Sequence, residues 1–348
     1  MASAIRIGLI NEMSDGPPAV TDIEAWLRRE VDELVACGRI DRPVEFVSSW
    51  GLGLPMGTAA AVERGFRELV DRDVLMIVGP AIGDNALVAT PLADRHRMPT
   101  INWAGAERAR SDYMFHLQVG SHEDESIVIA RHLAAAGATR AGVVFDESQI
   151  GRRHVGYLED EARRIGLRIA ASVSIKPLAE QAEAPVSELL DGRVDAIVYL
   201  GLGLSAPAVA SSLRARGWSG LTVMNTAGLR GYDETFARKI DGWHYVDMHS
   251  DNNGTLASLR DRLSIPPQRA LSAAKGHDLG RLVAEGIARA PELTRDGLRA
   301  GLEQVKWIPA AEGHDGTLLG FGVQDRGALH GRYLVLRQWR DGRSAQIG

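Results

Sequence analysis

The residues that could carry out chemistry do not form a known catalytic or cofactor-binding motif. Gly201-Leu202-Gly203-Leu204 follows an apolar run, but it lacks the third glycine of a dinucleotide-binding motif and suits a tight turn. The segment 79–83 has the glycines of a phosphate loop without its Lys-Ser/Thr ending. No Gly-x-Ser-x-Gly segment occurs, so a hydrolase nucleophile has no support. We therefore expect a protein that is not an enzyme and that uses no cofactor.

The residue types that bind metals are also poorly placed for a metal site. His122-Glu123 resembles a zinc-peptidase helix only in its first two letters. One cluster has four candidate ligands: His244, Asp247, His249 and Asp251. If this segment is a strand, the first histidine points away from the other three residues, and the last aspartate opens a turn. Cys37 is the single cysteine, which excludes an intramolecular disulfide and a thiolate cluster. We expect no bound metal.

The bulk composition is that of an ordinary globular protein. The chain has 348 residues, of which 45% are apolar and 24% charged, and a net charge of −5. This length suits two α/β lobes, and the absence of a basic run argues against nucleic acid. No apolar stretch reaches the roughly 18 residues of a membrane span. The N-terminus leads directly into a strand-like run, so we expect a cytoplasmic protein if Met1 is the native start. If an export signal was removed, we expect a periplasmic or cell-surface protein.

Short apolar runs alternate with amphipathic stretches of helical length, and this pattern predicts βαβ units and parallel sheets. In the first half, the predicted strands are 5–10, 43–48, 74–78 and 100–103. The pattern restarts after about residue 120 with predicted strands 141–145, 168–174, 194–200 and 221–224. The last hundred residues break this rhythm with strand 243–248, three helices between 254 and 305, a glycine-rich passage and strand 332–339. We therefore predict two Rossmann-like lobes with parallel sheets.

Ligands of open α/β sheets bind outside the carboxyl ends of the strands. Six loops meet this condition: 11–17, 50–54, 80–85, 103–106, 146–151 and 225–228. The candidate ligand-binding residues of the first half are Met13, Asp15, Trp50, Ile82, Gly83, Asp84, Asn85, Trp103, Ala104, Gly105 and Ala106. Those of the second half are Gln149, Ile150, Leu202, Asn225, Thr226 and Ala227. Asp84 and Asn85 also precede a predicted helix and could cap it. Trp50 and Trp103 could form a flat apolar surface for a hydrophobic solute.

Several segments, in their order along the chain, resemble those of one known family. Segment 5–10 is similar to its opening strand, and Val78-Gly79-Pro80 with Ala-Ile-Gly-Asp-Asn-Ala is similar to its glycine turn and first ligand loop. Segment 97–102 resembles the strand before its second ligand loop, and Lys275-Gly276-His277-Asp278 stands where a helix begins with Gly-Tyr-Asp. The closing segment 333–343 resembles its last strand and turn. The whole chain thus resembles the type I periplasmic solute-binding proteins of ABC transporters, in the class that binds leucine, isoleucine and valine.

The resemblance implies two lobes joined by a hinge of three crossings, near 117–121, 246–251 and 320–323. Lobe 1 would contain 1–119 and 251–321, and lobe 2 would contain 120–250 and 322–348. A small solute would bind in the cleft between the lobes, and hinge torsions would absorb the closure. The resemblance also implies an ABC transporter permease as partner. A regulatory partner protein is the alternative, because the same fold serves cytoplasmic sensors. An enzyme on a doubly wound sheet is the least favoured alternative.

The departures from the family pattern predict a different ligand. Family members that bind amino acids hold the carboxylate with Ser/Thr hydroxyls and backbone amides, and the ammonium with an acidic residue. This chain has Gly83, Asp84 and Asn85 at the serine-rich loop, Ala106 in place of threonine and Ala227 in place of the acidic residue. A buried ammonium without a carboxylate partner costs several kcal/mol. We therefore expect an aromatic or apolar solute rather than an ordinary α-amino acid.

Overall fold

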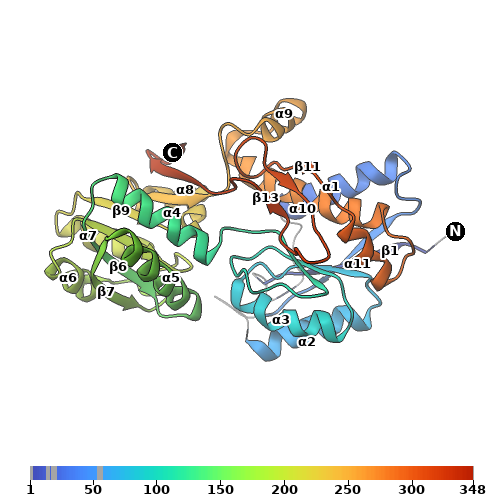
Figure 1. Ribbon diagram of the computed structural model, residues 1–348, viewed down its shortest axis with the longest axis horizontal. Helices are drawn as coiled ribbons and strands as arrows, with labels where there is room; N and C mark the ends of the chain where they lie inside the picture. Colours follow the sequence, from blue (N-terminus) through green and yellow to red (C-terminus); the bar gives the residue numbers. More distant parts are fainter. Residues whose placement is uncertain (1–2, 13–15, 17–21, 53–57, 348) are drawn as a thin grey trace. The chain divides into compact units, whose positions relative to one another are not determined.

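The computed structural model describes residues 3–12, 16, 22–52 and 58–347, and it divides into two α/β units (Figure 1). Unit 1 comprises Met1–Val119 and His249–Tyr333, and unit 2 comprises Gly120–Met248 and Leu334–Gly348. The chain therefore passes between the units three times. Each unit contains a sheet of mainly parallel strands with helices packed on it, which is the two-lobed α/β fold predicted from the alternating pattern.

The sheet of unit 1 has five parallel strands in the order β2-β1-β3-β4-β5. These strands are β1 (Ile5–Ile10), β2 (Val44–Ser49), β3 (Met76–Val78), β4 (Thr100–Asn102) and β5 (Met114–His116). The helices of this unit are α1 (Asp22–Ala36), α2 (Ala59–Asp71), α3 (Gly83–Arg95), α9 (Gly254–Leu263), α10 (Ala270–Ala288) and α11 (Arg295–Glu303), with the 3₁₀ turn η2 (Pro267–Arg269). Because all five strands run in the same direction, their carboxyl ends lie along one edge.

Alternate side chains of the unit-1 strands enter two different cores, one on each face of the sheet. Met76 and Val78 of β3 pack with residues of α1, α10 and α11. Ile77, which lies between them, packs with residues of α2 and α3 on the other face. Burial on both faces explains why these strands read as continuous apolar runs in the sequence.

The sheet of unit 2 has seven strands in the order β15-β14-β10-β9-β8-β6-β7. They are β6 (Arg140–Asp146), β7 (Arg168–Ile175), β8 (Ala196–Leu200), β9 (Leu221–Met224), β10 (His244–Asp247), β14 (Val335–Arg340) and β15 (Arg343–Gln346). The helices are α4 (His122–Ala135), α5 (Gln149–Ile165), α6 (Glu183–Asp191), α7 (Ala206–Ala215) and α8 (Glu234–Lys239), with the 3₁₀ turn η1 (Thr226–Tyr232). Two pairs of this sheet are antiparallel, β10 with β14 and β14 with β15, and the other pairs are parallel. No helix in the described part of the chain is long and apolar enough to cross a bilayer.

The third passage between the units lies later than the sequence predicts. It falls between Tyr333 and Leu334 rather than at 320–323. The intervening chain forms a small antiparallel sheet in unit 1, made of β11 (Ile308–Pro309), β12 (Leu318–Leu319) and β13 (Leu329–His330). A backbone hydrogen bond of 2.8 Å from the N–H of Ala328 to the carbonyl of His116 joins this segment to the end of β5. These bonds keep the segment in unit 1, so the predicted lobe limits 251–321 and 322–348 are corrected to the unit bounds given above.

Candidate functional site

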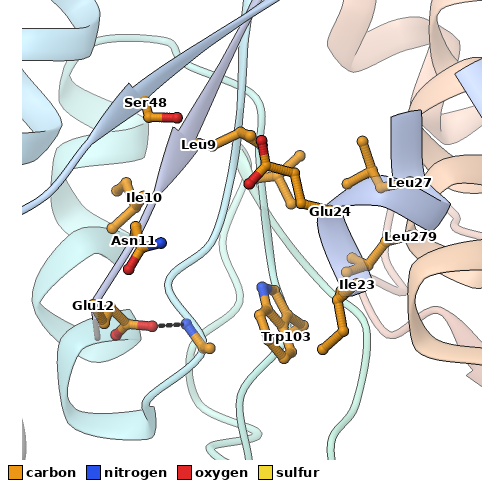
Figure 2. A pocket seen from close by; sticks show the side chains of 12 residues that line it. Leu9, Ile10, Asn11, Glu12, Ile23, Glu24, Leu27, Ser48, Trp103 and Leu279 are labelled. Carbon is orange, nitrogen blue, oxygen red and sulfur yellow. Dashed lines mark hydrogen bonds between the residues drawn. The ribbon is translucent and has the colours of Figure 1, made fainter. Parts of the chain in front are cut away.

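A pocket of about 190 Å³ lies at the carboxyl edge of the unit-1 sheet (Figure 2). Leu9, Ile10 and the two residues after them contribute from β1, and neighbouring strands contribute residues at or next to their ends. Side chains of α1 and α10 complete the wall. The volume is below the 300 to 1,000 Å³ of most ligand pockets, so this pocket suits one small group of a larger ligand or a very small solute.

The wall of the pocket is mainly apolar. Ile23 and Leu27 of α1 and Leu279 of α10 lie on one side in Figure 2, with the indole of Trp103 beside them. Leu27 and Leu279 are almost fully buried, which fixes their rotamers by packing. A backbone hydrogen bond of 3.1 Å from the N–H of Trp103 to the carbonyl of Pro80 holds the loop after β4 against the loop after β3. The pocket is therefore a preformed apolar surface with one aromatic face.

Glu12 supplies the main polar group of the opposite wall, two residues after β1 ends. Its carboxylate accepts hydrogen bonds from the backbone N–H of Ala81 and from that of Ile82 at 3.1 Å. It also accepts one from the side-chain amide of Asn85 at 2.7 Å. Burial raises the pKa of Glu12 from 4.5 to about 7, although these hydrogen bonds favour the ionised form. A carboxylate in this position is thus held by three donors inside an apolar setting.

The same contacts complete the start of α3. Ile82 occupies the N-cap position but has no polar side chain with which to cap the helix. Glu12, two residues after β1, accepts the N–H groups of Ile82 and of Ala81 just before the helix, and its negative charge lies near the positive end of the helix dipole. Asn85 is 1% exposed, and its Oδ1 has no hydrogen-bond partner among the described residues. Glu12 therefore belongs both to the pocket wall and to the hydrogen bonds just before α3.

The second acidic residue of the described lining is Glu24 of α1. It forms an ion pair with Arg28 one turn later, with a 3.0 Å bond to Nε. The guanidinium of Arg28 lies 4.5 Å from the centre of the Phe46 ring, which directs it along the outside of the sheet. Ser48 gives the only hydroxyl of the described lining, and no histidine or cysteine is present there. This lining can bind an apolar group, and it does not assemble a nucleophile with a base.

Known proteins of one family match most of the chain. A family model described as "Periplasmic binding protein" matches residues 55–335. The chain belongs to this periplasmic binding protein family. No curated protein sequence matches it.

Solved structures of the same fold cover almost the whole of this periplasmic binding protein. A periplasmic binding protein type 1 from Bordetella pertussis Tohama I has a TM-score of 0.82 at 17% identity, covering 99% of this chain and 100% of that chain. The leucine binding protein LivK from Thermotoga maritima MSB8 has a TM-score of 0.80 at 14% identity, covering 99% and 98%. LivJ from Streptococcus pneumoniae, solved with isoleucine, has a TM-score of 0.80 at 17% identity, covering 99% of both chains. These likenesses show the type I fold, and the family and these neighbours are solute-binding proteins rather than enzymes.

The residues predicted for the site in the first half of this periplasmic binding protein occupy several environments. Met13 and Asp15 lie outside the described residues. Gly83, Asp84 and Asn85 form the first turn of α3 next to Glu12. Of the predicted residues that the structure describes, only Trp103 lines the pocket.

The remaining predicted residues of unit 1 are close to the core. Ala104 and Ala106 are buried and pack with Ala86 of α3, so they join the loop after β4 to that helix. Gly105 between them is half-buried. Trp50 is also half-buried and is not part of the described pocket lining. The structure therefore does not show the surface of two tryptophans that the sequence suggested.

In unit 2, the predicted residues lie at the carboxyl edge of the sheet and are mostly engaged by the protein itself. Gln149 is exposed at the start of α5, whereas Ile150 is buried. The side chain of Asn225 donates to the carbonyl of Gly201 at 3.0 Å. The backbone N–H of Thr226 donates to Glu125 at 2.6 Å, and Ala227 packs into the core in η1. The amides of Asn225 and Thr226 thus donate to groups of the same unit.

Two buried acidic residues at the sheet edges, Glu12 and Asp146, lie in loops that the sequence selected but were not among its candidate residues. In unit 2, Asp146 ends β6 and accepts hydrogen bonds from Tyr199 Oη at 2.5 Å, from Ser205 Oγ at 2.9 Å and from the N–H of Leu202 at 2.6 Å. Burial raises the pKa of Asp146. In unit 1, the equivalent feature is Glu12. The signal available in the sequence was an acidic residue at or just after the end of an apolar run.

The cluster of metal-ligand residue types between 244 and 251 is divided in the structure. His244 and Asp247 belong to β10 of unit 2, whereas His249 begins a segment of unit 1. His244 Nδ1 lies 2.8 Å from His132 Nε2. Within the ranges that the structure describes, His, Cys, Asp and Glu side chains form no group of three that could hold a metal ion.

Proposed function

We propose that this chain is the solute-binding component of an ABC-type transport system. It captures a small molecule at the carboxyl edges of its two sheets. The units then close on this molecule by torsion changes in the three chain segments that connect them. The apolar pocket with Trp103 at the unit-1 edge is the observation that carries this proposal. Strand-end loops of open α/β sheets are where such folds bind ligands. The family match and the solute-binding proteins of the same fold support it.

The solute in this proposal is an aromatic or apolar molecule rather than an ordinary α-amino acid. Trp103, Leu27 and Leu279 give it a hydrophobic surface. Ala106 is buried in the core of unit 1, and Ala227 offers no carboxylate in unit 2 for an ammonium group. The permease of a transport complex is the proposed partner, and we propose that the protein works outside the cytoplasmic membrane, as members of this family typically do.

A thermal-shift screen tests the proposal directly. Purified protein is heated with amino acids, amides, aromatic acids and hydrophobic metabolites. A solute present at 100 times its dissociation constant adds about 2.7 kcal/mol to the stability of the folded state, which is easily detected. Aromatic or apolar compounds should give the largest shifts. If leucine or another amino acid gives the largest shift, the ligand class is wrong, and if no solute gives a shift, the binding function is wrong.

A pair of tryptophan variants locates the binding site. Trp103→Ala removes the aromatic face of the pocket and should raise the dissociation constant of the identified solute at least tenfold. Trp307→Ala is the matched control, because this residue is 69% exposed and lies outside the described pocket lining. Equal affinities of the two variants would place the ligand elsewhere.

A further inference from the structure

The start of α3 would bind an anion if the protein did not already supply one. The first backbone N–H groups of a helix point outward without partners and attract negative charge. Here the N–H groups of Ala81 and Ile82 both donate to the Glu12 carboxylate. The side-chain amide of Asn85, which could also hold a ligand acid, donates to the same carboxylate at 2.7 Å. These three donors are therefore already engaged by the protein itself.

The charges around the pocket also disfavour the binding of an anion. The described lining contains two carboxylates, Glu12 and Glu24, and no lysine, arginine or histidine. The cation nearest in sequence, Arg28, forms an ion pair with Glu24 and stacks on Phe46. An acid that entered the pocket would lose its water without gaining a positive partner, which is strongly unfavourable in an apolar setting. An uncharged or cationic group meets no such penalty.

We propose that Glu12 sets the charge selectivity of the unit-1 pocket, so that it accepts an apolar group with an amide or amine head and rejects the matching carboxylate. This proposal rests on the proposed function, because it assumes that the pocket receives the solute.

The test compares three head groups on the same apolar body. Benzylamine, benzamide and benzoate form one series, and isopentylamine, isovaleramide and isovalerate form a branched-chain series. Dissociation constants are measured calorimetrically at pH 8.5, where Glu12, whose pKa burial raises to about 7, is ionised. In the wild type, the acid of a series should bind at least tenfold more weakly than its amide.

Three variants test whether Glu12 sets the acid-to-amide ratio, which is the dissociation constant of the acid divided by that of the amide. Glu12→Gln keeps the size of the side chain and removes its charge, so the acid-to-amide ratio should fall at least fivefold. Glu63→Gln makes the same change at an exposed position of α2 in the same unit and should leave the ratio unchanged. Glu12→Asp keeps the charge and should keep the discrimination against acids.

The outcomes separate this proposal from the proposed function. A wild type that binds an acid as tightly as its amide overturns the charge selectivity, whether or not Glu12→Gln folds, and leaves solute binding intact. A ratio that is the same in Glu12→Gln and in Glu63→Gln also overturns it. If the wild type binds none of the six compounds, the charge proposal fails, and the broad thermal-shift screen then decides on solute binding separately.

Discussion

The buried ion pair between Lys275 and Glu312 should be among the most sensitive positions of unit 1. Lys275 Nζ lies 2.6 Å from Glu312 Oε2, and the two side chains are only 4% and 1% exposed. Lys275 Nζ also lies 3.4 Å from the carbonyl of Gln118, just before the chain first leaves unit 1. The pair thus connects α10 to a passage between the units.

The expected cost follows from burial. Removing one partner of a buried ion pair leaves an uncompensated charge and typically costs about 3 to 5 kcal/mol. Glu312→Gln and Lys275→Met should each reduce the free energy of unfolding of unit 1 by this amount. The double variant should cost less than the sum of the two single variants, because neither remaining side chain then buries an unpaired charge.

The measurement is urea unfolding combined with hydrogen exchange of the amides of α10. The exchange data report on unit 1 separately, which matters because a protein of two units need not unfold in one step. Glu45→Gln is the matched control, since Glu45 pairs with Arg6 at 3.1 Å but is 51% exposed. It should cost less than about 1 kcal/mol.

Two results would refute this reasoning. One is a cost for Glu312→Gln no larger than that for Glu45→Gln, which would mean that water reaches the buried pair. The other is a double variant that costs the full sum of the single variants, which would mean that the two side chains act independently.

Three further predictions concern pH and packing. Because burial raises the pKa of Glu12 from 4.5 to about 7, the wild type should lose roughly 3 kcal/mol relative to Glu12→Gln as pH rises from about 4.5 to 7; parallel urea stability curves would contradict this. Burial lowers the pKa of His122 from 6.5 to about 3, so unit 2 should lose stability as pH falls below about 6.5. His122→Leu should lose less on acidification to pH 4.5, whereas an equal loss would exclude this histidine as the cause. Gly301→Ala should cost about 1 to 3 kcal/mol because its Cβ would meet the Gly286 carbonyl and lie 2.8 Å from Ala290 N. Gly156→Ala has open space and should gain about 0.5 to 1 kcal/mol in thermal unfolding; a loss there would show that helix propensity does not dominate at that position.

The sheets of both units could be predicted because their strands are buried on both faces. Val74 to Val78 reads as one apolar run since its side chains enter two cores, and such a run between helical patterns predicts a parallel strand. The small sheet of unit 1 could not be predicted in this way. β11, β12 and β13 have two residues each, which is too short for an alternating pattern, so the third passage was placed too early.

The candidate site could be predicted only in part. The rule for carboxyl ends of parallel strands selected the loop containing Trp103, which lines the pocket. Ile23, Leu27 and Leu279 come from helices, where their helical spacing indicated only a buried face. Glu12 bonds to Ala81 across 69 positions of the sequence, and no local pattern predicts a hydrogen bond between such distant residues.

Both units have a buried carboxylate at the carboxyl edge of the sheet. In unit 1, Glu12 accepts the N–H groups of Ala81 and Ile82 just before α3, and in unit 2, Asp146 accepts the N–H of Leu202 in the loop before α7. Burial raises the pKa of each carboxyl, which shows that both are held where their charge is poorly solvated. An external carboxylate needs unoccupied donors, and the N–H groups of Ala81, Ile82 and Leu202 already donate to carboxylates of the chain itself. This arrangement supports the proposal of a solute that binds through apolar contact rather than through a carboxylate.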